Sequence, residues 1–328
     1  SLDDGFILEK VSVPLGVIGV IFESRPDALI QISSLCLKSG NAALLKGGKE
    51  ALFTNQCLFD LIEKAIENSD RGFEGCLQLL ESREEIKEML TLNDYIDLII
   101  PRGSNDLVRF IQKNTSIPVM GHADGICHVY IDEAADMDMA VSVTYDAKCQ
   151  YPAVCNALET LLVHEKIAAS FLPKLTRKFN GQVEIRGDEK TREIIPVAEA
   201  SEEDWRTEYT DLILSVKIVA SMEQAINHIN NFSSHHTDSI ITNDEKTATE
   251  FLNRIDSSSV MHNCSTRFAD GFRYGFGAEV GVSTSKVHAR GPVGLQGLMT
   301  YKYKVVGQGH IVADYANGKK QFNHQELI

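Results

Sequence analysis

Apolar residues follow two alternating patterns along residues 1–141. Short runs of aliphatic and β-branched residues are typical of strands, and the stretches between them carry apolar residues at helical spacing. One such stretch, 27–39, is followed by Gly40, where a helix can end. The expected order is strand 10–22, helix 27–39, strand 41–46, helix 54–68, strand 77–80, helix 83–90, strand 95–100 and helix 105–112. This alternation predicts a doubly wound parallel sheet.

A second unit of the same kind is predicted from about residue 142. Its expected order is strand 161–164, helix 168–180, strand 211–219, helix 222–230, strand 239–242 and helix 246–254. A glycine-rich stretch follows, and 301–306 then indicates a strand without a helical partner, suited to pairing with another domain or chain. We therefore expect an α/β fold in three parts, 1–141, 142–298 and 299–328.

Composition excludes several classes of protein. The net charge of -14 argues against a nucleic-acid partner, so any anionic ligand must be held by a local basic cluster. No apolar run approaches the roughly 20 residues of a membrane span. Seven cysteines, an odd number without a C-x-x-C pair, argue against a disulfide framework and favour a reducing compartment.

No metal site is expected. The histidines 228, 235 and 236 have no cysteine or acidic residue at ligand spacing, which favours a surface loop. The acidic N-terminus has neither an initiator Met nor an apolar signal segment, so we expect a piece of a longer protein.

The candidate chemistry centres on Cys155. It lies among small residues with Pro152 ahead of it, a pattern that predicts a position at or near a helix start. Backbone N–H groups that converge there lower the pKa of a thiol and can stabilise an oxyanion. The alternative is a buried structural cysteine, which the local sequence leaves open.

Three loops are candidates for anion binding. Lys46 and Lys49 flank a glycine pair after a predicted strand, where the ligand crevice of a parallel sheet lies. Gly103 and Ser104 form a turn into a helix N-terminus, which can bind phosphate. Arg267 lies in a basic, glycine-punctuated region that suits a carboxylate. Ordinary solvated loops and caps remain the alternative for each, and the fingerprint G-x-G-x-x-G is missing after the first strand.

Four segments fall in the order seen in the aldehyde dehydrogenase superfamily: 13–26, 47–51, 151–160 and 277–284. Over about 11–298 the chain most resembles the γ-glutamyl phosphate reductase family. Segments 99–104 and 118–122 are similar to the reductase half of bifunctional pyrroline-5-carboxylate synthases. The resemblance implies two doubly wound α/β domains with a β oligomerisation arm, a homo-oligomer, a glutamate kinase domain before residue 1, and a cytoplasmic or mitochondrial-matrix location.

The resemblance also implies a reaction. Cys155 attacks the acyl carbon of γ-glutamyl phosphate, phosphate leaves, and NADPH reduces the thioester to glutamate 5-semialdehyde. Asn156 and Ser24 are the implied oxyanion residues. The positions that match cofactor-binding residues are Lys46, Lys49, Gly103, Ser104 and Glu208. Lys49 stands where NAD-using relatives often carry an acidic residue, which favours NADPH.

At some motif positions this sequence differs from the superfamily pattern, and each difference predicts a property of the site. Val119 stands at the position of the glutamate that activates water, so hydrolysis of the thioester should be slow. Ser24 replaces the usual oxyanion asparagine, and Arg25 beside it is expected to hold the leaving phosphate. The loop Ser265-Thr266-Arg267 is expected to hold the substrate carboxylate. The alternatives are a water-using aldehyde dehydrogenase and a catalytically silent assembly or regulatory partner.

Overall fold

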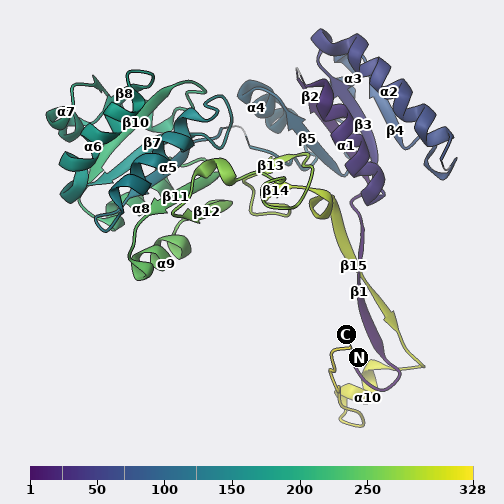
Figure 1. Cartoon of the computed structure of the whole chain (residues 1–328). Helices are drawn as coiled ribbons and strands as arrows, with labels where there is room; N and C mark the ends of the chain where they lie inside the picture. The colour runs from purple at the N-terminus through teal and green to yellow at the C-terminus, as the bar shows by residue number, and fades with distance from the viewer. Residues whose placement is uncertain (24, 70, 123, 328) are drawn as a thin grey trace.

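The chain forms two lobes, each built on a parallel sheet, and a long two-stranded arm (Figure 1). A computed structural model describes residues 1–23, 25–69, 71–122 and 124–327. Within these ranges, no helix is long and apolar enough to cross a membrane. The α/β class predicted from the sequence is confirmed, because all strand pairs within both large sheets are parallel.

The N-terminal lobe contains a four-stranded sheet. Its order is β4 (Leu77–Leu80), β3 (Ala42–Gly47), β2 (Val17–Phe22) and β5 (Leu98–Arg102). The helices are α1 (Pro26–Ser39), α2 (Leu52–Glu67), α3 (Arg83–Met89) and α4 (Asn105–Asn114). Local chemistry sets the ends of α1: Pro26 occupies the first turn, where its missing N–H costs nothing, and Gly40 takes a left-handed φ of 76°.

The C-terminal lobe contains a seven-stranded sheet. Its order is β12 (Ser259–His262), β11 (Thr237–Ile241), β6 (Cys127–Ile131), β7 (Leu158–His164), β10 (Ile213–Val219), β8 (Glu184–Gly187) and β9 (Ala198–Glu199). The helices are α5 (Met137–Cys149), α6 (Glu165–Phe179), α7 (Glu189–Ile194), α8 (Met222–Phe232) and α9 (Glu245–Arg254). Strand β7 is buried along its whole length, as expected for a central parallel strand.

The structure corrects the predicted domain boundaries. Strand β6 already pairs in the second sheet, so the boundary between residues 141 and 142 falls inside α5. The short strands β13 (Gly281–Ser283) and β14 (Gly291–Val293) lie between the lobes (Figure 1). Val280, Val293 and Leu298 pack into the apolar core of the N-terminal lobe. The glycine-rich stretch thus returns to the first lobe rather than ending the second one.

The prediction of one strand over 10–22 is wrong. That segment is divided between β1 (Ile7–Pro14) in the arm and β2 in the sheet. Between them Gly16 has a φ of 135°, and a Cβ there would lie 2.1 Å from the Asp97 carboxylate, which accepts a hydrogen bond from Val17 N. The chain can turn from the arm into the sheet here because residue 16 is glycine, which alone accepts this φ and this close approach to Asp97.

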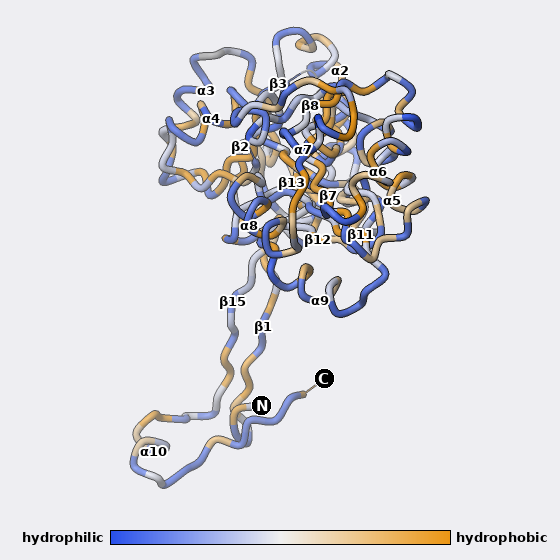
Figure 2. The backbone as a smooth tube through the Cα atoms, turned by 90° about the vertical axis from the view of Figure 1, so that its left-hand side faces the viewer, coloured by the Kyte–Doolittle hydropathy of each residue, from blue (hydrophilic) through white to orange (hydrophobic). Residues whose placement is uncertain are grey.

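The C-terminal strand is not a lone strand. Strand β15 (Met299–Val306) pairs antiparallel with β1, from Ile7 opposite Val306 to Pro14 opposite Met299. Both chain ends and α10 (Val312–Ala316) lie at the far end of this arm (Figures 1 and 2).

Candidate active site

A cavity of about 660 Å³ lies between the two lobes. The carboxyl end of β5, the start of α4, the loop before β6 and the segment around β13 line it, together with the loop after α5. This volume is in the range of small-molecule sites. Seven of the predicted residues line it: Arg25, Gly103, Ser104, Cys155, Asn156, Glu208 and Arg267.

Cys155 does not lie at a helix start. Helix α5 ends at Cys149, and residues 150–157 form turns before β7 begins at Leu158. The predicted source of a low pKa, a helix N-terminus, is therefore wrong. The turn is tightly packed instead, because a Cβ on Gly125 would lie 2.3 Å from the carbonyl oxygen of Cys155.

Two histidines that the sequence did not reveal surround the sulfur. One ligand-capable atom of each of His122, His236 and Cys155 lies within 4.8 Å of the others. The two imidazole rings meet edge to face, with centroids 4.7 Å apart. They come from separate loops, one before β6 and one before β11, so no local spacing could have shown that they meet.

The histidines decide the ionisation of the thiol. Burial alone would raise the pKa of Cys155, but the positive charges of His236 and His122 outweigh it and hold that pKa well below the usual value. Burial disfavours the imidazolium of His122, yet the Cys155 thiolate and the Val282 carbonyl raise the pKa of this ring. The arrangement is a thiolate–imidazolium pair, the reactive form of a catalytic cysteine.

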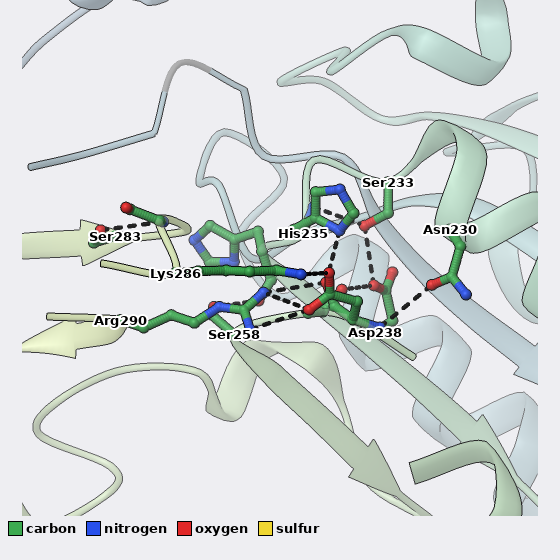
Figure 3. A network of polar contacts seen from close by, with 12 residues as sticks. Asn230, Ser233, His235, Asp238, Ser258, Ser283, Lys286 and Arg290 are labelled. Atoms are coloured by element: carbon green, nitrogen blue, oxygen red, sulfur yellow. Dashed lines mark hydrogen bonds and ion pairs between the residues drawn. The ribbon is translucent and has the colours of Figure 1, made fainter. Parts of the chain in front are cut away.

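Hydrogen bonds hold His122 and His236 in place, next to the polar network of Ser258, Lys286 and Arg290 (Figure 3). His122 Nδ1 lies 2.8 Å from the carbonyl oxygen of Val282 in β13, and the carbonyl of His236 accepts a 2.6 Å hydrogen bond from Ser258. The Asp256 carboxylate lies 2.6 Å from Lys286 Nζ and 3.2 Å from Arg290, which fixes the loop between β13 and β14.

The prediction that His228, His235 and His236 lie on a surface loop is wrong. His236 and His228 are buried, and His235 is half-buried with its Nδ1 donating to the carbonyl of Asp256. Burial lowers the pKa of His228 to about 2, and this ring stacks on Phe232 away from the cavity.

Arg267, the predicted carboxylate-binding residue, lies in the cavity wall. Its side chain is nearly buried, and its Nε donates to Gln150 Oε1 at 3.0 Å, which fixes the guanidinium at the cavity wall. Ser265 and Thr266 are buried and do not line the cavity. Ser265 Oγ instead accepts a hydrogen bond from Arg267 N, so it caps the short 3-10 turn Thr266–Phe268.

A second arginine, Arg102, joins Arg25 at the cavity. It ends β5, and its guanidinium packs against Gly281, where a Cβ would lie 3.2 Å from one of its nitrogens. Burial lowers the pKa of Arg102, and the nearby charge of Arg25 lowers it further. Among the described residues, neither arginine has a carboxylate within 4.0 Å, so this pair of like charges favours an anion.

Some of the predicted cofactor residues line the cavity, and others lie outside it. Glu208 reaches across the interface between the lobes and accepts a 3.1 Å hydrogen bond from Asn105 at the start of α4. Ser104 N–H donates to the Glu23 carboxylate at 2.8 Å, so an acidic side chain already occupies the anion position of this helix. Lys46 and Lys49 lie outside the cavity lining, at the end of β3, on the same sheet edge.

Of the two predicted oxyanion residues, Asn156 lies in the cavity lining. Asn156 Nδ2 donates to the carbonyl of Ala269 at 2.9 Å, so this amide ties the Cys155 loop to the 3-10 turn. Ser24 lies outside the described residues. Val119 runs beside β5 and pairs with Ile99, whereas Met120, Gly121 and His122 continue into the cavity.

Comparisons with known proteins agree with this fold. The profile of the aldehyde dehydrogenase family matches residues 3–213. The chain belongs to the aldehyde dehydrogenase family, as its fold also indicates. An acetylating aldehyde dehydrogenase from Geobacillus thermoglucosidasius superposes with a TM-score of 0.72 at 18% identity, over 95% of this chain and 79% of that one.

Within this family, the chain groups with the γ-glutamyl phosphate reductases. It is 61% identical to the one from Pelotomaculum thermopropionicum, over 100% of this chain and 75% of that protein. The crystal structure of γ-glutamyl phosphate reductase from Thermotoga maritima superposes with a TM-score of 0.91 at 46% identity, over 94% of this chain and 75% of that one.

Proposed function

We propose that this chain reduces γ-glutamyl phosphate to glutamate 5-semialdehyde and phosphate, with NADPH as the hydride donor. One observation carries the proposal: a thiolate flanked by two imidazoles shares a cavity with several arginines, among them Arg25, Arg102 and Arg267. A nucleophilic sulfur suits an acyl carbon, and the arginines suit a substrate with a phosphate at one end and a carboxylate at the other.

The chain's own residues account for the acyl transfer. Cys155 Sγ attacks the acyl carbon, the bond between that carbon and the phosphate oxygen breaks, and phosphate leaves with the electron pair. The cofactor supplies a hydride to the resulting thioester. The oxyanion then re-forms a C=O bond and expels the Cys155 thiolate, which His122 and His236 stabilise.

The thioester is expected to resist water. Val119 offers no carboxylate where oxidising relatives place their general base. The carboxylates in the cavity lining already accept hydrogen bonds from the chain: Glu23 from Ser104 N, Glu208 from Asn105, Asp270 from Phe272 N, and Glu279 from Gly271 N at 2.9 Å. A long-lived thioester suits hydride transfer in one direction and attack by phosphate in the other.

The test is the reverse reaction, with glutamate 5-semialdehyde and NADP. Reduction of NADP is expected to require inorganic phosphate, and arsenate should replace it because it attacks the same thioester. Oxidation that proceeds equally well without either anion would instead identify a water-using aldehyde dehydrogenase. No turnover by an intact fold would support the silent-partner alternative.

The arginine pair should set the affinity for phosphate in this assay. Arg25→Gln and Arg102→Gln are each expected to raise the KM for phosphate about tenfold, the value of one charged hydrogen bond. The KM for NADP should stay unchanged. Arg254→Gln, on the exposed face of α9, is the matched control. Unchanged phosphate KM values in both cavity variants would remove these arginines from the phosphate site.

Arg267 should set the affinity for the carbon substrate. Arg267→Leu removes a nearly buried guanidinium opposite the substrate carboxylate, which costs about 2 kcal/mol or more and predicts an increase in KM for the semialdehyde of roughly 30-fold. The KM values for phosphate and NADP should change far less. An equal rise in all three would indicate a collapsed site rather than a lost contact.

Other residues support the proposed binding of NADPH and the proposed pairing with a second copy of the chain. The carboxyl edge of the N-terminal sheet, where parallel sheets bind nucleotides, carries Lys46, Lys49, Gly103 and Ser104. Lys49 is exposed, which suits a contact with the 2′-phosphate of NADPH.

The arm exposes apolar and aromatic side chains along both strands, which supports pairing with a second copy. All seven cysteines are free, which supports a reducing compartment such as the cytoplasm.

A further inference from the structure

We propose that Cys155, His122 and His236 form a site for a soft divalent cation, with Zn²⁺ the fitting ion, and that this cation blocks the nucleophile reversibly. The three ligand atoms lie within 4.8 Å of one another. One thiolate and two imidazoles form a donor set that zinc prefers, as in catalytic sites with three protein ligands and one open position. The binding rests on this cluster alone, and only the inhibition rests on the proposed function.

His236 supplies the strongest evidence for a ligand. The residue is fully buried, and its Nδ1 lies 2.9 Å from Thr237 Oγ1. Its Nε2 is buried without a regular hydrogen-bond partner among the described residues. The His236 ring interacts with the Cys155 thiolate in the metal-free site, and a cation in the cluster would give this buried nitrogen a direct bond.

His122 is oriented in the manner of a metal ligand. Its Nδ1–H donates to the carbonyl oxygen of Val282 at 2.8 Å, so Nε2 can offer its lone pair to the cluster once it releases its proton. Imidazoles that bind metals usually donate their other N–H to a carbonyl or carboxylate, because this fixes the ring and its tautomer. The Asp256 contacts with Lys286 and Arg290 hold the loop that follows Val282 (Figure 3).

The fourth coordination position opens into the cavity. Cys155 and His122 both line that space, which has room for a water molecule beside the ion. Binding forms one Zn–S and two Zn–N bonds, and the N–H bond of the His122 imidazolium breaks as its Nε2 proton leaves to solvent. The lone pair of the Cys155 sulfur is then unavailable for attack on an acyl carbon. A chelator that removes the cation restores the nucleophile.

The full chain should be titrated with Cd²⁺, whose thiolate complexes absorb in the ultraviolet, and separately with Zn²⁺ under assay. We expect one Cd²⁺ per chain, an absorbance that Cys155→Ser removes, and inhibition by Zn²⁺ that EDTA reverses. His236→Asn should weaken Cd²⁺ binding at least tenfold. The control is Cys57→Ser, an exposed cysteine on α2 outside the cavity lining, which should bind like the wild type.

Several results would overturn the site. These are the absence of a thiolate–Cd²⁺ absorbance in the wild type, an absorbance that Cys155→Ser retains, or an affinity that His236→Asn leaves unchanged. If His236→Asn does not fold, His122→Asn provides the same comparison. A chain that reduces γ-glutamyl phosphate without binding Cd²⁺ loses only the metal site, whereas one that binds Cd²⁺ without turnover loses only the proposed function.

Discussion

Cys155→Ser is expected to lower phosphate-dependent reduction of NADP by at least about 10⁴-fold while the chain stays folded. The hydroxyl is a far weaker nucleophile at neutral pH, and the imidazoles that stabilise a thiolate cannot ionise it comparably. The measurement is kcat/KM for the semialdehyde at saturating phosphate, with circular dichroism to confirm the fold. Activity within tenfold of the wild type would exclude a covalent role for this sulfur.

Alkylation provides an independent test of the same sulfur. At pH 7 iodoacetamide should modify Cys155 at least roughly tenfold faster than Cys57, because His122 and His236 hold the pKa of Cys155 well below that of an ordinary thiol. Peptide mass spectrometry gives both rates within one sample. Loss of activity should follow the modification of Cys155 in proportion, and equal rates at the two cysteines would contradict the thiolate.

Above about pH 8, where the Glu159 carboxyl is ionised, Lys148→Met is expected to lower the free energy of unfolding by roughly 3 kcal/mol or more. Lys148 of α5 is fully buried, and its Nζ lies 2.8 Å from the Glu159 carboxylate in β7. Removing the ammonium leaves that carboxylate in the core without its charged partner. Urea denaturation measures the loss, and Lys166→Met is the control because the exposed ion pair of Lys166 with Glu133 contributes little.

The loss should also depend on pH. Burial raises the pKa of Glu159 from 4.5 to about 8, although Lys148 opposes the rise. The folded chain therefore holds this proton more tightly than the unfolded chain, and the free energy of unfolding decreases as pH rises across that interval. Without Lys148 the pKa rises further, so the variant should lose more stability above pH 8 than below it. Equal losses of stability in the Lys148 and Lys166 variants would contradict the buried pair.

Local chemistry made several elements predictable. Helix α1 runs over Pro26–Ser39 where 27–39 was expected, since proline and glycine mark its ends. Strand β4 matches its prediction of 77–80. By contrast, α5 was missed because its buried face includes Thr144 and Lys148, which break the apolar stripe. Strand β6 was missed because His128 interrupts a short buried run, and only the fold supplies its partner, Asp238, at 3.0 Å.

The sequence by itself predicted the parallel α/β architecture, because period and turn residues are local properties. Its resemblance to a known family then made Cys155, Arg25 and Arg267 candidate site residues. Only the tertiary structure decided which side chains surround the Cys155 sulfur. His122 and His236 stand more than a hundred residues apart along the chain, on loops without any regular period. The folding of β6 and β11 side by side brings these rings together, and no local pattern records that pairing.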